Sequence, residues 1–209
     1  MNVLVIGGTR GVGRAVVMAT HAAGHTLTVM ARNAADFASP ASGIRMVVGD
    51  AADPDDIERA TAGQRAVVWA VGVAATRREV NVFSRGTHHL LLAMQAHGVR
   101  RLVCVTGGAT GPHAGRGAAL RARIARPLAR RAVGDDQKRQ ETQIRASAVD
   151  WTIVCPAAMT DAGATGLYQV RAAPVAGRAK PLPRADVADF IVANLAAPDY
   201  FGSVVVLTG

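Results

Sequence analysis

Residues 3–13 read VLVIGGTRGVG, and this stretch decides the fold. Four apolar residues predict a buried strand, the glycines after them a tight turn, and the residues up to Gly24 a helix. Glycines at such a turn let the backbone approach a diphosphate, while the helix start supplies N–H groups and the positive end of a dipole. The stretch therefore predicts a dinucleotide site. The residues expected to line it are Gly7, Thr9, Arg10, Gly11, Val12 and Gly13.

The end of the second predicted strand indicates which dinucleotide binds. Residues 26–30 read TLTVM and are followed by Ala31 and Arg32, about twenty residues after the glycines. An acidic residue here would bind the ribose of NAD, and none is present. Arg32 instead offers a planar, permanently charged guanidinium suited to a 2′-phosphate, which Arg10 can approach from the other side. NADPH is therefore the predicted cofactor.

The composition is that of one domain with no membrane span. The 209 residues are enough for one sizeable core, and no linker divides them. Half of the residues are hydrophobic, but the apolar runs are too short to cross a bilayer. A strand begins directly at the N-terminus, without an export signal, so a cytoplasmic protein is expected. Cys104 and Cys155 lack the clustered partners of a zinc site, so we expect buried, reduced thiols and no metal.

Strand and helix patterns alternate along the rest of the chain. Apolar runs predict strands at residues 44–48, 66–71, 102–105, 151–155 and 204–207. Helices are predicted after the Asp53-Pro54 N-cap, from Val80 to His97 with Gly98 as the stop, and from Asp135 to Ser147. With right-handed crossovers this predicts an α/β fold, a Rossmann-type doubly wound parallel sheet with helices on both faces. The expected strand order is 3-2-1-4-5-6 with an extra strand at the edge.

Ligands of such sheets bind beyond the carboxyl ends of the strands, so the residues after each strand are the candidate site. Asp50 is expected either to accept a hydrogen bond from the adenine amino group or to cap its own loop. Gly72 either brings backbone close to the cofactor or forms an ordinary turn. Thr106 is the first candidate for a catalytic polar contact beside the nicotinamide, the alternative being a hydroxyl bonded to backbone. The other predicted cofactor contacts are Ala51, Ala70, Val71, Pro156, Ala157, Ala158 and Met159.

The whole chain carries a formal net charge of +9, and basic residues gather in its second half. Three interpretations are open. A nucleic-acid surface lacks stacking aromatics and signature motifs here, so no specific nucleic-acid partner is expected. The others are a solvated arginine-rich face, and a substrate flap around residues 109–134 that attracts an anionic substrate or cofactor. The residues concerned are Arg116, Arg121, Arg123, Arg126, Arg130, Arg131, Lys138, Arg139 and Arg145, with Asp135, Asp136 and Glu141 among them.

Lys138 is the second catalytic candidate. It is expected either to contact ribose or substrate, or to be a solvated helical charge in a surface pair. Met159, Tyr168 and Phe83 are candidates for an apolar substrate wall, with core packing as the alternative for Phe83.

The motif Gly7-x-x-x-Gly11-x-Gly13 with Arg10 resembles the cofactor loop of short-chain dehydrogenases/reductases. The rest of the chain resembles their compact atypical relatives, the NAD(P)H-binding, NmrA-like group. Within that group the resemblance is closest to the flavin reductase type, also called biliverdin reductase B. This implies NADPH binding, a monomer, and reduction of a flavin or tetrapyrrole. The similar segments are VGD at 48–50, MQAHGV at 94–99, SAVDWTIVCP at 147–156 and RADVA at 184–188.

The Ser-Tyr-Lys set with which ordinary short-chain dehydrogenases protonate a carbonyl is missing. Gly134 stands four residues before Lys138, Tyr168 and Tyr200 are the only tyrosines, and Gly107 replaces the serine of flavin-reductase-like proteins. Keto reduction by the tyrosine route is therefore not expected. The expected function is NADPH-dependent reduction of a flavin, quinone or similar conjugated small molecule. The alternatives are an NADP(H)-sensing regulator of NmrA type and a redox-neutral isomerase or cyclase.

Overall fold

The apolar runs of the sequence form the strands of one large sheet. The computed structural model describes residues 1–33, 43–74, 78–107, 128–172 and 179–209, with backbone alone at 128–131. The strands are β1 (Asn2–Ile6), β2 (Thr26–Ala31), β3 (Ile44–Val48), β4 (Ala66–Trp69), β5 (Arg101–Val105), β6 (Asp150–Pro156), β7 (Met159–Thr160), β8 (Gln169–Ala172), β9 (Leu182–Pro183) and β10 (Ser203–Thr208).

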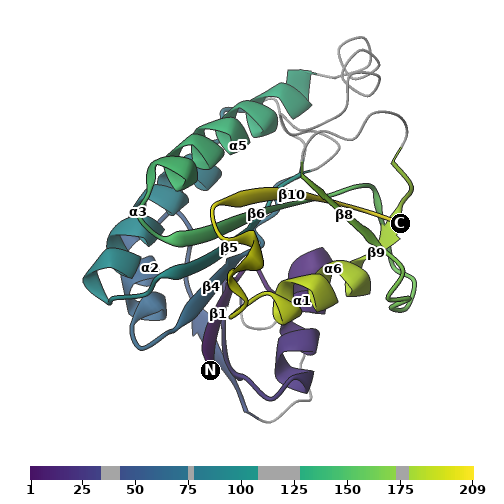
Figure 1. The fold of residues 1–209 in the computed structure, drawn as a ribbon. Helices are drawn as coiled ribbons and strands as arrows, with labels where there is room; N and C mark the ends of the chain where they lie inside the picture. Colours follow the sequence, from purple (N-terminus) through teal and green to yellow (C-terminus); the bar gives the residue numbers. More distant parts are fainter. Residues whose placement is uncertain (34–42, 75–77, 108–127, 173–178) are drawn as a thin grey trace.

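Helices cover both faces of this sheet, as predicted (Figure 1). One face is covered by α1 (Gly11–Ala22) and α6 (Arg184–Ala193), and the other by α2 (Pro54–Thr61), α3 (Val82–Ala96) and α5 (Leu128–Ala146). A short 3-10 helix, η2 (Pro198–Tyr200), precedes β10. Asp53 caps α2 by accepting the N–H groups of Asp55 and Asp56, as expected from the Asp-Pro pair.

The strand order in the large sheet is β3-β2-β1-β4-β5-β6-β10-β8. The first six strands confirm the predicted order, and β10 is the predicted extra strand, parallel to β6. The sequence did not indicate β8, which pairs antiparallel with β10, or the small parallel pair β7–β9. From β1 the chain first adds strands on one side, β2 and β3, and then on the other side, β4 to β6. The crevice for a ligand therefore lies at the carboxyl end of β1, where this direction changes.

The side chains of alternate residues of β1 pack into two separate apolar layers, one on each face of the sheet. Val3 and Val5 pack with the residues of α1 and α6, whereas Leu4 and Ile6 pack with those of α2, α3 and α5. All four side chains are at most 1% exposed. A parallel strand covered on both faces needs apolar residues at every position, which explains the unbroken run VLVI.

Two boundaries that bear on the site differ from the prediction, and one helix was not predicted. β4 ends at Trp69 rather than at Val71, because the glycine loop passes over the chain at Ala70. α5 begins at Leu128 rather than at Asp135, so the end of the expected substrate flap is helical, and residues 109–127 of that flap lie outside the described residues. α6 was not predicted, because Pro183 at its N-cap makes no side-chain capping bond that would mark a start.

Arg101 is a buried cation at the amino-terminal edge of the sheet. It is 5% exposed, and its guanidinium donates to the carbonyl oxygens of Asp150, Asn194 and Leu195 at 2.7, 2.9 and 3.2 Å. It also lies 4.6 Å from the ring centroid of Phe201. Burial lowers the pKa of Arg101 to about 10, so the side chain stays charged at neutral pH. These contacts fasten the end of α6 to β5, opposite the edge that carries the glycine loop.

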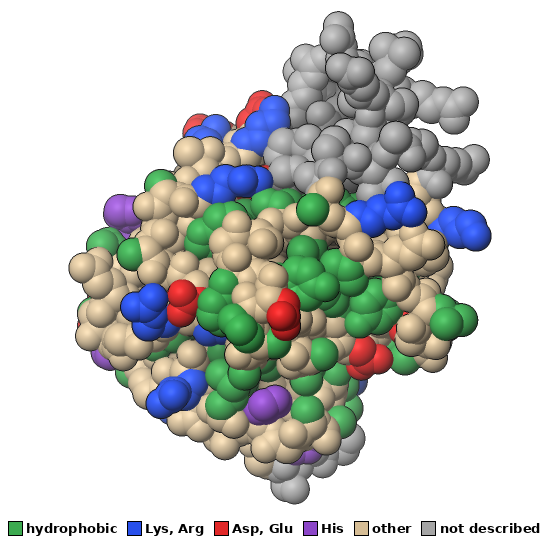
Figure 2. All heavy atoms as spheres, in the orientation of Figure 1, with side chains coloured by type: hydrophobic (Ala, Val, Ile, Leu, Met, Phe, Trp, Pro, Cys, Tyr) green, Lys and Arg blue, Asp and Glu red, His purple; other side chains and the backbone are tan. Residues whose placement is uncertain are grey.

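The surface of the described residues shows no single basic patch on the face drawn in Figure 2, where Lys and Arg side chains are spread over several places. Arg116, Arg121, Arg123 and Arg126 lie outside the described residues, and of Arg130 and Arg131 only the helical backbone is described. Within the described ranges, none of the helices has both the length and the apolar character that a membrane crossing requires.

Candidate functional site

The turn between β1 and α1 is fixed by glycines in close backbone contact. Gly7 has a φ of +88°, and a β-carbon there would lie 2.8 Å from the carbonyl oxygen of Ala70 and 2.9 Å from Cα of Val71. At Gly13 a β-carbon would lie 2.1 Å from the carbonyl oxygen of Gly7. Any larger residue at Gly7 or Gly13 would displace the backbone. The two glycines thus press the loop against the end of β4, and α1 against the loop, as a diphosphate cradle requires.

The first turn of α1 is suited to an anion. Its N-cap residue, Arg10, has extended backbone and makes no side-chain capping bond, and the first turn contains no acidic residue. The first N–H groups of a helix have no partner within the helix and carry the positive end of its dipole. Thr9, Gly11 and Val12 are exposed or half-buried at this turn. A diphosphate therefore fits the loop in both shape and charge.

Two arginines lie in the loops that follow β1 and β2, beside this turn. β1 and β2 pair in parallel with Ile6 opposite Met30, and the N–H of Gly7 donates to the carbonyl oxygen of Met30 at 3.1 Å. Arg10 and Arg32 therefore belong to loops that start from the same edge, and both side chains are exposed. The positions that follow β2 up to residue 33 include no acidic side chain.

The loop after β3 is held by its own carboxylates. Asp50 Oδ1 accepts the N–H of Ala52 at 2.9 Å, and the N–H of Asp50 donates to Asp56 Oδ2 at 2.8 Å. The bond from the Asp50 N–H, and then the bond from the Arg59 guanidinium, lower the pKa of Asp56. The structure thus shows the loop-capping role that was one of the two expectations for Asp50, and its contact with adenine stays a prediction.

The end of β4 borders the glycine loop. Ala70 is buried and donates its N–H to the carbonyl oxygen of Ile6 at 2.9 Å, and Val71 packs partly buried against the layer of α3. Around Gly72, in contrast, no described residue other than its two chain neighbours would lie within 4 Å of a β-carbon. The carbonyl oxygen of Ala51 packs against Gly86 of α3, where a β-carbon would lie 2.2 Å from it.

Thr106 follows β5 but is only 3% exposed. Its hydroxyl lies 3.1 Å from Sγ of Cys155 on β6, so its partner is a thiol and not the backbone that the alternative interpretation required. Burial raises the pKa of Cys155 to about 12, and burial also raises that of Cys104 well above its usual value. Both cysteines are free and buried, as predicted, and such thiols are protonated and unreactive at neutral pH. A contact between Thr106 and a nicotinamide stays a prediction.

Lys138 lies on the solvent side of α5. Its Nζ is 3.3 Å from Oδ1 of Asp135, and the two side chains are 54% and 61% exposed. This is the surface pair of the second interpretation. The side chains of Lys138 and Thr106, the two catalytic candidates, thus make polar contacts with Asp135 and Cys155 respectively.

Sequence analysis missed the role of the neighbouring carboxylate, Asp136, which is fully buried. It accepts the N–H groups of Phe83 and Ser84 at 2.9 and 3.4 Å and the hydroxyl of Ser84, and thereby caps α3. Arg139 donates to Asp136 and to the carbonyl oxygen of Val80, both at 3.2 Å. The two residues whose N–H groups are capped, Phe83 and Ser84, precede Asp136 by more than fifty residues in the chain, so no local pattern could reveal this cap.

The residues considered for an apolar substrate wall separate into two groups. Phe83 is 1% exposed and belongs to the core, whereas Met159 and Tyr168 are half-buried on the side of α6. The rings of Tyr168 and Tyr200 lie 6.1 and 5.3 Å from the ring of Phe190. Both tyrosines of the chain therefore pack against α6.

Residues 156–159 lead from the end of β6 into β7. The N–H of Ala157 donates to Leu207 at 2.8 Å, the N–H of Leu182 donates to Ala158 at 2.9 Å, and Met159 pairs with Leu182 in the β7–β9 sheet. The predicted cofactor contacts at 156–159 are therefore tied by backbone bonds to β10 and to β9, the strand that enters α6.

The start of α6 is held by a second buried carboxylate that sequence analysis did not assign. Asp186 is fully buried and accepts the N–H groups of Thr165 and Gly166 at 2.7 and 2.9 Å, and the hydroxyl of Thr165 at 2.6 Å. Burial alone would raise the pKa of Asp186, but these hydrogen bonds outweigh it and lower the pKa. The loop before β8 is thereby fixed to the first turn of α6.

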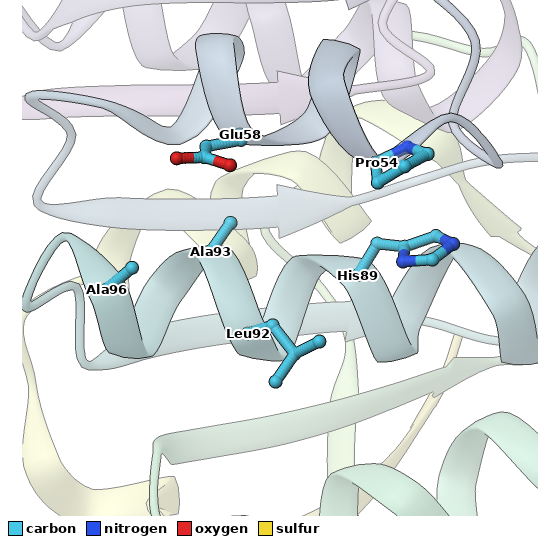
Figure 3. A pocket seen from close by; sticks show the side chains of 6 residues that line it. All are labelled: Pro54, Glu58, His89, Leu92, Ala93 and Ala96. Atoms are coloured by element: carbon cyan, nitrogen blue, oxygen red, sulfur yellow. The ribbon is translucent and has the colours of Figure 1, made fainter.

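A shallow depression of about 200 Å³ lies between α2 and α3 (Figure 3). Burial lowers the pKa of His89 at its edge, so this imidazole is neutral at neutral pH. Without a cation or a glycine turn among its lining residues, the depression does not match a nucleotide. Its lining residues are Pro54, Glu58, His89, Leu92, Ala93 and Ala96. Within the described ranges, no cluster of His, Cys, Asp or Glu could hold a metal ion.

The glycine cradle agrees with a family model described as NAD(P)H-binding, which matches residues 7–198. The chain belongs to the NAD(P)H-binding family. The match starts at Gly7, the first residue of the turn, and continues through α6.

Solved structures share the fold of this NAD(P)H-binding protein over nearly its whole length. A Rossmann-fold NAD(P)-binding family protein from Shigella flexneri is 21% identical, with a TM-score of 0.76 over 99% of this chain and 92% of that one. The oxidoreductase ylbE from Lactococcus lactis is 18% identical, with a TM-score of 0.79 over 100% and 91%. A short-chain dehydrogenase/reductase from Veillonella parvula in complex with NADP is 13% identical, with a TM-score of 0.81 over 100% and 94%. These likenesses show the Rossmann fold.

Proposed function

We propose that this protein is an NADPH-dependent reductase of a small conjugated acceptor, such as a flavin or a quinone. The observation that carries the proposal is the cradle at the end of β1. The close backbone approach at Gly7 and Gly13 gives the tight strand–turn–helix geometry that diphosphate-binding loops use, and the first turn of α1 carries no acid that would repel an anion.

The arginines beside the cradle support the preference for NADPH. Arg10 and Arg32 are both exposed, and β2 is not followed by the carboxylate that would bind an unmodified ribose. A guanidinium can make two parallel hydrogen bonds to a phosphate, and it stays charged at any physiological pH. We assign the 2′-phosphate to these two side chains and the diphosphate to the turn between them.

The chemistry of the site fits an acceptor that needs little help from acid–base groups. When bound, the coenzyme would supply the hydride. Thr106 and Cys155 contribute buried, uncharged groups at the ends of β5 and β6, and the Cys155 thiol is not ionised at neutral pH. Tyr168 and Tyr200 pack against Phe190 of α6, which supports a reaction without a tyrosine acid. The resemblance to the flavin reductase type favours the same class of acceptor.

Steady-state oxidation of NADPH, followed by its absorbance, tests the proposed reaction with FMN, menadione and dichlorophenolindophenol as acceptors. The proposal expects turnover with at least one of them. Tight NADPH binding without turnover would instead favour a coenzyme-sensing regulator. Consumption of a substrate without any change in coenzyme absorbance would favour a redox-neutral enzyme.

Substitution of the two arginines tests the coenzyme assignment. Arg10→Ala and Arg32→Ala should each raise the Kd of NADPH about ten-fold or more, because each removes a charged hydrogen-bond donor, and should leave the Kd of NADH nearly unchanged. Calorimetric titration of both coenzymes measures the effect. Arg65→Ala, an exposed arginine just before β4 at the opposite edge, is the control. An equal loss for both coenzymes would contradict the assignment.

A further inference from the structure

A third arginine lies against the glycine loop, although it comes from the far end of the sequence. Arg184 is the first residue of α6, directly after β9. A β-carbon placed on Gly11 would lie 3.8 Å from Nε of Arg184. The Arg184 guanidinium is therefore within contact distance of the first residue of α1, where the diphosphate of a dinucleotide is expected.

The position of Arg184 is fixed by the elements around it. α6 lies beside α1 on the same face of the sheet (Figure 1), and their apolar residues share one core. The β7–β9 pair and the hydrogen bonds of Asp186 hold the start of α6. The Arg184 side chain is 27% exposed, so most of it is packed and part of it remains accessible to solvent. An arginine held in this way loses less conformational entropy on binding than a free surface arginine would.

The present partner of Arg184 is a weak one. Its Nη1 donates to Oδ1 of Asp161, whose side chain is 90% exposed. An ion pair with such an exposed carboxylate contributes little, because water and salt screen it. A diphosphate seated on the turn would bring more negative charge to the same guanidinium, in a geometry that suits a planar donor.

We infer that Arg184 is a further ligand of the coenzyme diphosphate, and that Asp161 competes with the diphosphate for it. The inference rests on the proposed function in so far as a dinucleotide binds at the glycine turn. It assigns to α6 a task distinct from that of Arg10 and Arg32. Those two residues read the 2′-phosphate, whereas Arg184 contacts a group that NADPH and NADH share.

Calorimetry with three probes separates these tasks. Arg184→Gln should raise the Kd of NADPH and of NADH alike, by about ten-fold, because each loses one charged hydrogen-bond donor. Its affinity for adenosine 2′-monophosphate, which has no diphosphate, should not change. The matched control is Arg100→Gln, since Arg100 pairs with Asp150 at 3.2 Å on the opposite edge of the sheet. Unchanged Kd values for both coenzymes, or a loss confined to NADPH, would overturn the inference.

A second substitution guards against damage to the fold. Asp161→Asn alters an exposed side chain, and it should lower the Kd of both coenzymes about three-fold by releasing Arg184. The gain should disappear when Asp161→Asn is made in the Arg184→Gln background, because the two residues act through one contact. A gain of equal size in both backgrounds would overturn the competition. Failure of the unmodified protein to bind either coenzyme would reject the proposed function and the inference together, whereas normal binding by Arg184→Gln would reject the inference alone.

Discussion

The two helical layers on either side of the sheet are assembled by different kinds of contact. Between α1, β1 and β2 the contacts are apolar or backbone-to-backbone, so that a β-carbon at Gly8 would lie 2.7 Å from Val17 and 2.8 Å from Val29. Between α3 and α5 they include buried polar groups, such as the bond from Gln140 Nε2 to Thr87 Oγ1 at 2.8 Å and the cap that Asp136 provides. The first layer depends on shape, and the second on hydrogen bonds.

This difference matters for the proposed function. In the layer of α1, the glycine turn is in close backbone contact and the first helical turn has no acidic residue, so an anionic ligand meets no like charge there. In the layer of α5, the buried carboxylate of Asp136 accepts the first N–H groups of α3, so the start of α3 already has an anion beside it. Of the two helix starts, that of α1 is the one free to receive a diphosphate.

The largest expected effect concerns shape. Gly13→Ala would place a β-carbon 2.1 Å from the carbonyl oxygen of Gly7, so the loop must move. We expect loss of coenzyme binding, and a fall of about 3 kcal/mol in the free energy of unfolding. Urea unfolding and calorimetry measure the two quantities. Gly163→Ala, where a β-carbon would meet no described residue beyond its chain neighbours within 4 Å, should change neither. Normal coenzyme binding by Gly13→Ala would break the claim that the α1 layer depends on shape.

The next effect concerns the hydrogen bonds of the other layer. Asp136→Ala removes the cap of α3 and leaves buried donors without a partner, so it should lower the free energy of unfolding by about 2 kcal/mol. Asp135→Ala is the adjacent control. Its exposed pair with Lys138 should contribute less than about 0.5 kcal/mol. Equal losses in chemical denaturation for the two variants would show that the buried cap does not stabilise this layer.

The smallest expected effect concerns Asp186, a buried carboxylate on α6 at the end of the otherwise apolar layer of α1 and α6. It tests whether a hydrogen-bonded carboxylate also stabilises this layer. Its pKa is lowered below the ordinary value of 3.8, so the ionised form stabilises the fold above that pH. This stabilisation is lost as the pH falls through the lower pKa of the folded state. Asp186→Asn should therefore be less stable than the unmodified protein at neutral pH, with a difference that narrows in acid. Thermal unfolding across this pH range measures it, with the exposed Asp189→Asn as control.

The sequence predicted those parts of the site that neighbouring residues determine. Gly7 and Gly13 contact each other within one turn, and Asp53 caps the helix that follows it, so a short motif carries the information. Arg184 and Asp136 were missed because each acts on a helix formed by a distant part of the chain. Such contacts depend on how helices pack on the sheet, and no local spacing encodes that.

The side-chain environment at strand ends was also beyond the sequence. Thr106 was correctly placed after β5, but only the register with β6 shows that its hydroxyl meets the thiol of Cys155. Lys138 lies on a helix as expected, and whether it faces solvent depends on which side of α5 packs against α3. Patterns therefore predict which residues approach the edge, and the packing decides which of them are accessible.

The position of β10 has a consequence for the order in which the molecule can assemble. This strand lies between β6 and β8, yet it is the last of the three along the chain. β8 has no other neighbour in the large sheet as described, so it cannot pair until β10 has been synthesised. A chain still emerging from the ribosome therefore leaves one edge of β6 unpaired, and the large sheet is complete only when residues 203–208 have been synthesised.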